Sequence, residues 1–180
     1  MTEREQARKP ETMAVPVLTM PQMLREHARH QPSTLAIRQK DFGIWQPITW
    51  SGYFERARAF GLGLEALGVT AGGHVGVLSE NRAEWVIAQM GAGIIHAVTV
   101  GVYPTSPANE VAYVLAHADV DVVVVEDQEQ ADKVLDCRAD LPRLRRIVVV
   151  DMRGLKAYDH PDLIPFDEVE RLGAERHAAE

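Results

Sequence analysis

Residues 122–125 read VVVV, and residues 147–150 read IVVV. Unbroken aliphatic runs of this length are typical of strands that helices cover on both faces of a parallel sheet. Residues 74–79 and 98–102 are two further apolar runs that predict strands. Segments with helical spacing separate these runs, so strand and helix alternate at close to even intervals. The sequence therefore predicts an α/β fold built on part of a doubly wound parallel sheet.

The predicted helices are marked by apolar residues that recur every three or four positions. The first begins after Thr49 and ends at Gly68, because glycine readily takes the left-handed conformation that closes a helix. The second runs from residue 81 or 82 to 96, the third opens at Ser106-Pro107, and the fourth covers residues 127–137. The residues predicted to face the core are Tyr53, Ala57, Phe60, Leu64 and Leu67 in the first helix, and Val111, Val114 and Leu115 in the third.

Before the first of these helices, the sequence predicts three features. Residues 1–20 are expected to form a flexible arm, and a short helix is expected directly after Thr19. Residues 35–38 and 45–48 are predicted to pair as a short hairpin around the turn-like Asp41-Phe42-Gly43.

The C-terminal part of the sequence is polar and turn-rich beyond Asp151. A short helix is predicted from Phe166 to Leu172, followed by a tail at residues 173–180. We therefore expect one partial domain over residues 21–172, between the arm and the tail.

Composition argues against several classes of protein. The chain carries 19 Lys and Arg against 26 Asp and Glu, a net charge of −7, whereas nucleic-acid-binding proteins usually present a basic face. Its single cysteine, Cys137, can form neither an internal disulfide nor a zinc cluster. No apolar run approaches the ~20 residues of a membrane-spanning helix, and residues 1–12 lack the apolar segment of a secretory signal. We expect a cytoplasmic protein with no nucleic-acid partner and no transmembrane segment.

Motifs that would identify a catalytic site from the residues alone are missing from the sequence. Gly61-x-Gly63 and Gly91-x-Gly93 lack the third glycine of a dinucleotide-binding loop, and we assign them to close helix packing. No lysine follows a glycine, which excludes a Walker-type phosphate loop. Neither the G-x-S-x-G of hydrolases nor the H-E-x-x-H of zinc proteases occurs.

The loops that follow the predicted strands are where an open parallel sheet binds ligands. Residues 79–82 follow the first of these strands, and residues 103–107 follow the second. Asn81 and the two hydroxyl residues of the second loop are interpreted first as helix caps, with ligand contact as the alternative. The acidic residues 126–129 most simply place negative charge at a helix N-terminus, and a magnesium site is the weaker interpretation.

Several segments resemble, in order, the adenylate-forming synthetases, a family of acyl-CoA synthetases, peptide-synthetase adenylation domains and luciferases. Residues 48–51 (ITWS), with the helix ending at Leu67-Gly68, are similar to the family's first core segment. Residues 72–77 (GGHVGV) match its strand entry Gly-Asp-x-Val, except that Gly73-His74 replaces Gly-Asp. Residues 78–85 (LSENRAEW) are close to the version found in acyl-CoA synthetases.

Further segments resemble the long-chain fatty acid subgroup of that family. Residues 103–106 (YPTS) and 111–115 (VAYVL) match its second core segment and the helix that follows. Residues 125–130 (VEDQEQ) and 166–168 (FDE) are also similar to this subgroup. The likeness extends over residues 20–172, and the order of the segments supports it more than any single motif.

The resemblance implies that the complete enzyme activates a fatty acid with ATP and magnesium to an acyl-adenylate, then transfers the acyl group to coenzyme A (CoA). The family's Ser/Thr/Gly-rich loop ending in Pro-Lys-Gly, its acids for magnesium and ribose, and its C-terminal lysine have no counterpart in this sequence. We therefore predict an N-terminal portion of an AMP-forming fatty acid–CoA ligase that is inactive alone. No catalytic residue, metal ligand or cofactor is expected for the chain by itself, and the complete enzyme could lie peripheral to a membrane.

By the same resemblance, the segment after the third central strand can approach the nucleotide part of CoA. This makes Lys133 and Arg138 candidates for contact with a CoA phosphate. The competing interpretation is that both are solvated charges on a helix.

A partial sheet should expose an edge strand and apolar faces. The expected partners are therefore the remainder of the synthetase or a second copy of the chain. Two alternatives stay open at this point: a non-catalytic α/β binding or interaction module, and a truncated gene product without activity.

Overall fold

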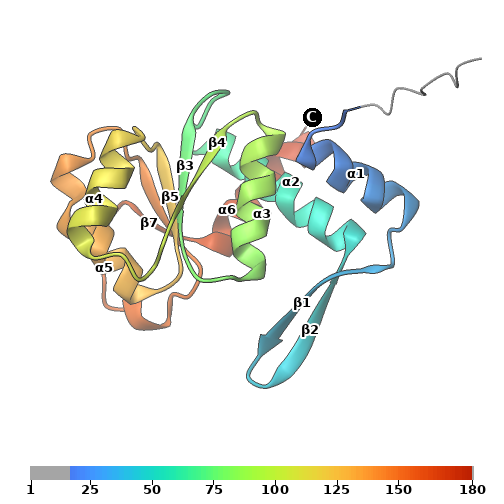
Figure 1. The fold of residues 1–180 in the computed structure, drawn as a ribbon, viewed down its shortest axis with the longest axis horizontal. Helices are drawn as coiled ribbons and strands as arrows, with labels where there is room; N and C mark the ends of the chain where they lie inside the picture. The colour runs from blue at the N-terminus through green and yellow to red at the C-terminus, as the bar shows by residue number, and fades with distance from the viewer. Residues whose placement is uncertain (1–16, 180) are drawn as a thin grey trace, which may run out of the picture.

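The computed structural model describes residues 17–179, which hold six α-helices, two 3-10 helices and seven strands (Figure 1). The helices are α1 (Met20–His30), α2 (Trp50–Ala66), α3 (Ala83–Ile94), α4 (Ala108–His117), α5 (Gln128–Asp136), η1 (Arg138–Asp140), η2 (Arg153–Leu155) and α6 (Phe166–Ala179). The strands are β1 (Leu35–Asp41), β2 (Ile44–Thr49), β3 (His74–Leu78), β4 (Val98–Val102), β5 (Val122–Val125), β6 (Arg146–Val149) and β7 (Leu163–Pro165).

Five parallel strands form the central sheet, in the order β4-β3-β5-β6-β7. Strands β3 and β5 are neighbours although β4 lies between them in the chain, so the chain reverses its direction across the sheet there. The predicted doubly wound α/β sheet is confirmed. The sequence did not reveal β7, because a three-residue strand ending in proline lacks the long aliphatic run of the other strands.

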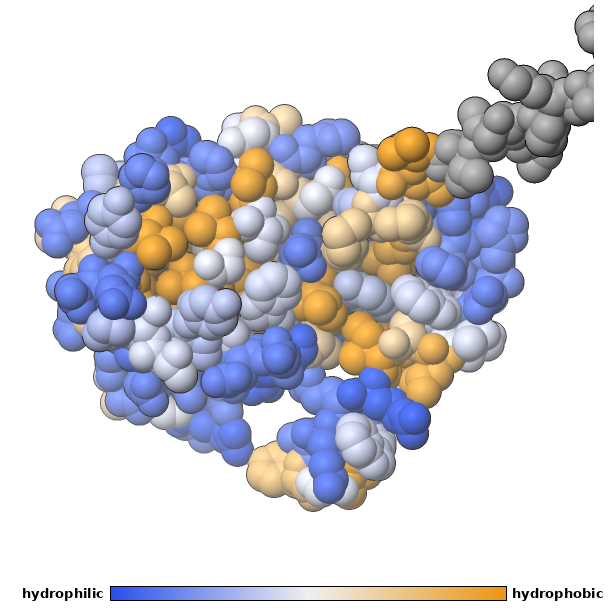
Figure 2. Space-filling model, in the orientation of Figure 1, coloured by the Kyte–Doolittle hydropathy of each residue, from blue (hydrophilic) through white to orange (hydrophobic). Residues whose placement is uncertain are grey.

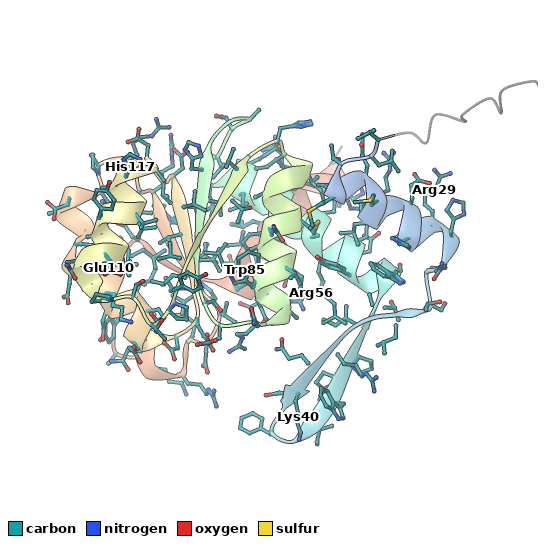
Figure 3. The ribbon with its side chains drawn as sticks, in the orientation of Figure 1. Arg29, Lys40, Arg56, Trp85, Glu110 and His117 are labelled. Atoms are coloured by element: carbon teal, nitrogen blue, oxygen red, sulfur yellow. The ribbon has the colours of Figure 1, made fainter. Side chains whose placement is uncertain are left out.

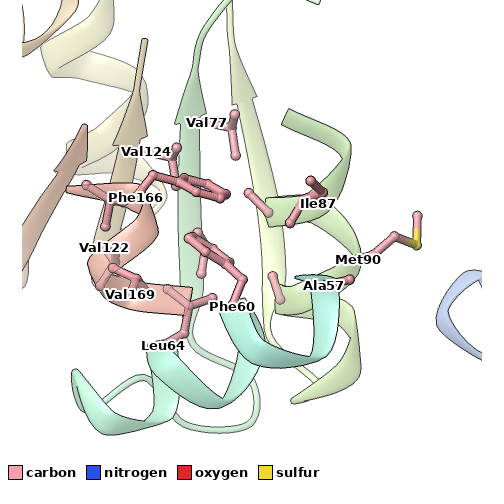
Figure 4. Close-up of a cluster of buried hydrophobic side chains, with 14 of the residues drawn as sticks. Ala57, Phe60, Leu64, Val77, Ile87, Met90, Val122, Val124, Phe166 and Val169 are labelled. Carbon is pink, nitrogen blue, oxygen red and sulfur yellow. The ribbon is translucent and has the colours of Figure 1, made fainter. Parts of the chain in front are cut away.

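Each face of the central sheet has its own hydrophobic core. Helices α2, α3 and α6 cover one face, and α4 and α5 cover the other. Figure 4 shows the first core, in which the rings of Phe60 and Phe166 stack with their centroids 4.3 Å apart. Strand β5 contributes alternate valines to the two cores, which explains why its four residues are all apolar.

Helix α2 packs against both α3 and α6 on the first face. Four of its five predicted core residues are buried, and the fifth, Leu67, is half-buried. A Cβ atom added to Gly61 would lie 2.6 Å from the carbonyl oxygen of Gly91 in α3. A Cβ atom on Gly173 in α6 would overlap the Ala59 carbonyl of α2. These glycines let the helix backbones approach closely. The sequence predicts this role for Gly61 and Gly91.

The hairpin of β1 and β2 projects away from the central sheet (Figure 1). Its strands pair antiparallel, as predicted, but they are longer than predicted: Asp41 lies in β1 opposite Ile44, which leaves two turn residues between them. Ile37 packs against the first core, and the Gln39 side chain accepts a hydrogen bond from the Ala83 amide at 2.6 Å. The hairpin therefore supplies the hydrogen-bond acceptor for the first amide of α3.

The helix starts agree only in part with the sequence predictions. Thr19 caps α1 in a capping box, as the sequence suggests. The prediction that Asn81 caps α3 is wrong: the N-cap is Arg82, whose guanidinium has no acceptor atom to offer the helix amides. Gln39 instead accepts from the first amide of the helix, that of Ala83. Helix α4 is capped at Pro107 without a side-chain hydrogen bond, so the hydroxyl residues before it are not caps either.

The two ends of the chain also differ from prediction in extent. Helix α6 continues past the expected end at Leu172 as far as Ala179, so residues 173–179 are helical rather than a tail. The contact of Gly173 with α2 explains this, because the extra turns pack against another helix. Most of the predicted arm, residues 1–16, lies outside the described residues.

Candidate functional site

The carboxyl ends of β3 and β4 border a cleft of about 350 Å³. The two loops that the sequence marks as ligand-binding candidates meet here. Trp85 of α3, labelled in Figure 3, forms one side of the cleft and packs against the β4 backbone at Gly101. The lining residues are Ser79, Glu80, Asn81, Trp85, Gly101, Val102, Tyr103 and Pro104.

Glu126 holds the first loop of this cleft in place. It follows the last residue of β5, the strand beside β3, and its side chain is 20% exposed. One carboxylate oxygen accepts hydrogen bonds from the Glu80 amide at 2.8 Å and from Ser79 Oγ at 3.3 Å. The other accepts from Arg82 Nη1 at 3.1 Å. The carboxylate thereby holds the backbone at Glu80 and the side chain of Arg82, the two residues that flank Asn81.

Arg82 links the same loop to the start of α3. Its guanidinium lies 3.1 Å from Glu126 and 3.2 Å from Glu84. Partial burial alone would lower the pKa of Arg82, but the hydrogen bonds and charges of Glu126 and Glu84 outweigh it and raise the pKa. Arg82 therefore stays charged in the loop, paired with the two carboxylates.

Lys133 anchors the second loop of the cleft. Its Nζ donates to the carbonyl oxygen of Pro104 at 2.7 Å and to Gln130 Oε1 at 3.1 Å, and it lies 3.1 Å from Glu129. The side chain is only 18% exposed, so Lys133 is not a solvated helix charge. It does lie on the side of the molecule that carries the cleft, because Pro104 lines that cleft.

Arg138 lies at the opposite end of the sheet, near the amino ends of β6 and β7. Its guanidinium donates to Asp162 at 2.6 Å and to the carbonyl oxygens of Leu141 and Leu144 at 2.9 and 2.7 Å. The structure does not bring Arg138 together with Lys133, since they sit beyond opposite ends of the strands.

A second, larger cleft of about 630 Å³ separates the hairpin from the start of α3. It shares Asn81 and Trp85 with the first cleft, so the two hollows adjoin across the loop after β3. The space-filling view in Figure 2 shows the gap between the hairpin and the body. Basic residues line much of it: Arg38, Lys40, Arg82 and Arg153.

The described residues do not form a metal centre by themselves. Over residues 17–179, no three side chains of His, Cys, Asp or Glu gather closely enough to hold a metal ion. The acidic segment after β5 instead caps a helix: Asp127 accepts a hydrogen bond from the Gln130 amide at 3.3 Å. The helix-terminus interpretation is confirmed for Asp127 and Glu129, whereas Glu126 bonds to the loop after β3.

A family model described as "AMP-binding enzyme" matches residues 24–175. The chain belongs to this family. The match includes both loops of the cleft and extends from α1 into α6, so it covers the whole central sheet.

Relatives of this chain include long-chain-fatty-acid–CoA ligases. ACSBG2 of Xenopus laevis is 29% identical over 160 residues, which cover 89% of this chain and 21% of that protein. FadD15 of Mycobacterium bovis is 33% identical over 137 residues, which cover 76% of this chain and 23% of that protein. The chain thus spans about a fifth of the length of these curated relatives and matches an N-terminal portion of the family.

Solved structures of ligases share the fold. The anthranilate CoA ligase AuaEII, in complex with anthranoyl-AMP, superposes with a TM-score of 0.71 at 26% identity, covering 84% of this chain and 26% of that one. Coronafacic acid ligase from Pectobacterium brasiliense has a TM-score of 0.74 at 16% identity, covering 86% and 29%. The second likeness shows the fold alone.

The sequence predicted the two loops of the cleft but missed the residue that organises the first of them. Glu126 was assigned with its neighbours to a helix N-terminus, and only Asp127 and Glu129 have that role. The available signal was its position directly after a buried strand, at the point where the strand order reverses.

No helix within residues 17–179 combines the length and the apolar character needed to cross a bilayer.

Proposed function

We propose that the cleft at the ends of β3 and β4 forms one wall of the active site of an ATP-dependent, AMP-forming fatty acid–CoA ligase. The observation that carries this proposal is the position of the cleft. It lies at the carboxyl edge of a doubly wound sheet, next to the point where the strand order reverses, which is where such sheets bind ligands. Membership of the AMP-binding family and the long-chain-fatty-acid–CoA ligases among the relatives support the reaction class.

The proposed reaction has two steps. A carboxylate oxygen of the fatty acid attacks the α-phosphorus of ATP and releases pyrophosphate, giving an acyl-adenylate. The thiol of CoA then attacks the acyl carbon and releases AMP. Both steps depend on positioning and on stabilising phosphoryl charge, for which the complete enzyme uses magnesium.

In the proposed reaction, the described residues hold the loops of the cleft in place and do not react themselves. Glu126 holds the backbone around Asn81, and Lys133 holds the backbone at Pro104. Rigid loops at both sides of the cleft keep its shape fixed for a bound substrate.

The contact of Lys133 and Arg138 with a CoA phosphate stays a prediction. Both side chains are committed to hydrogen bonds within the chain, and Arg138 lies at the far end of the sheet from the cleft. If they contact CoA in a complete ligase, charge reversal at both should raise the KM for CoA. An unchanged KM for CoA in a folded enzyme would remove both residues from the site.

Pyrophosphate exchange into ATP, driven by fatty acids, tests the proposed function. We predict no exchange by the 180-residue chain alone. A chimera, in which residues 24–175 replace the matching segment of FadD15 from Mycobacterium bovis, should exchange pyrophosphate. Turnover by the isolated chain would refute its predicted inactivity, and a folded but inactive chimera would contradict the role of the cleft.

A further inference from the structure

The turn of the β1–β2 hairpin presents apolar side chains to solvent. Phe42, Ile44 and Trp45 are 84%, 66% and 57% exposed. Figure 1 shows the hairpin projecting from the body, and Figure 2 shows apolar surface at its far end. Single exposed apolar residues are ordinary, but three within four positions at a projecting tip form a patch. We call these three residues the hairpin tip.

Phe42 occupies a backbone conformation that its side chain disfavours. Its φ is 44°, and that of Gly43 is 84°, so both central residues of the turn are left-handed. Hairpin turns of this kind prefer Asn-Gly or Asp-Gly, because a bulky residue at positive φ is strained. The ring of Phe42 stays mostly in solvent, with the Arg153 guanidinium over one face of it. Strain at a ring that is this exposed points to a role for it outside the fold.

Basic side chains surround the hairpin tip. The Arg38 guanidinium and the Lys40 ammonium each lie 5.8 Å from the centroid of the Trp45 ring. The Arg153 guanidinium lies 5.6 Å from the centroid of the Phe42 ring. In Figure 3 the labelled Lys40 lies near the end of the hairpin.

Acidic groups balance these cations only in part. Asp41 precedes the turn, and Asp151 is paired with Arg153. Three cations against two acids leave the surroundings of the tip positive by one, although the whole chain carries −7. The tip is therefore the part of the described surface where apolar and basic side chains meet on a projecting element.

We propose that the hairpin tip inserts into the headgroup region of an anionic phospholipid bilayer. Exposed aromatic and aliphatic residues flanked by Lys and Arg suit this environment, because the rings enter the acyl boundary while the cations pair with phosphates. A protein partner would have to bury the same cations, which is costly unless each finds an acid. The negative charge of the rest of the chain disfavours any other contact with an anionic surface, so binding should occur through the tip.

Flotation with lipid vesicles tests the proposal on the full 180-residue chain. We expect binding to vesicles of phosphatidylcholine mixed with phosphatidylglycerol, weaker binding to phosphatidylcholine alone, and a decline as salt is added. Phe42→Asn places the favoured Asn-Gly pair in the turn, so it should raise the melting temperature while lowering vesicle binding about tenfold. The double variant R38Q/K40Q should lose the preference for anionic vesicles.

Tyr113→Asn is the matched control, because Tyr113 is a 68% exposed aromatic residue on α4, away from the hairpin. It should bind vesicles like the unchanged chain. The proposal is overturned if the unchanged chain does not float, if Phe42→Asn floats equally well, or if the control loses as much binding. It is also overturned if light scattering shows that Phe42→Asn abolishes a self-association that accounts for the binding, since the tip would then contact a second copy.

Discussion

Each end of the central sheet has an acidic residue that accepts a hydrogen bond from a backbone amide and pairs with an arginine, but the two acids have different roles. At the amino ends, the carboxylate of Asp121 accepts a hydrogen bond from the His74 amide at 3.1 Å and lies 3.2 Å from Arg143. At the carboxyl ends, Glu126 accepts from the Glu80 amide at 2.8 Å and lies 3.1 Å from Arg82. Each acid joins the backbone of a neighbouring strand to an arginine.

The difference lies in what surrounds each acid. The side chain of Asp121 is 6% exposed and ties down the start of β3, with only a very small hollow nearby, lined in part by Arg143. The side chain of Glu126 is 20% exposed and supports a loop that borders a cleft of about 350 Å³. We infer that contacts at the amino end of the sheet stabilise the fold, whereas contacts at the carboxyl end shape a ligand site. Mutations at the two ends should therefore affect stability and activity separately.

The largest effect on stability is expected at the amino end. Asp121→Ala leaves the partly buried His74 amide without its acceptor, which should cost about 2 kcal/mol of unfolding free energy. Urea unfolding followed by circular dichroism measures it. Asp121→Asn keeps the acceptor and should cost much less. Equal losses from both variants would mean that the ion pairs, and not the amide contact, stabilise this end.

A smaller effect on stability is expected from Glu126→Gln at the carboxyl end. Glutamine can keep one acceptor for the loop but loses the charge that pairs with Arg82, at a cost of about 1 kcal/mol. The same urea experiment applies. A loss larger than that of Asp121→Ala would reverse the comparison between the two ends.

Lys133→Met tests the second loop of the cleft. Methionine replaces the aliphatic stem, while the hydrogen bond to the Pro104 carbonyl is lost, at a cost of about 0.5–1 kcal/mol. Hydrogen exchange should quicken at residues 103–107 and stay unchanged at the amino ends of the strands. Unchanged exchange in that loop would show that Lys133 does not anchor it.

The smallest effect is expected at the pair formed by Asp151 and Arg153. Hydrogen bonds from Arg153 lower the pKa of Asp151 to about 2. The stabilisation is therefore fully present above the ordinary pKa of an aspartate and is lost as pH falls through about 2. Arg153→Gln should return the pKa of Asp151 toward its usual range. Titration of the carboxyl carbon by NMR measures this shift, and a pKa that stays near 2 in the variant would rule out Arg153 as its cause.

The features that could be predicted from the sequence are those set by interactions between neighbouring residues. The valine run of β5 and the glycine at position 68 act through neighbouring residues, so this strand and the end of α2 were predictable. The cap of α3 was not, because its partner Gln39 comes from a hairpin 44 residues earlier in the chain. The loop positions of the cleft followed from the parallel sheet, whereas the role of Glu126 depends on strand order, which periodicity does not encode.

The most direct test of the proposed active-site wall uses the chimeric ligase in pyrophosphate exchange with a fatty acid. Exchange per folded enzyme should survive Asp121→Asn, because that residue lies at the amino end of the sheet. Glu126→Gln should lower it by about tenfold or more, because a loop displaced by an ångström can cost as much as a hundredfold in rate. Equal exchange in the two variants, with both folded, would contradict the claim that the carboxyl end carries the site.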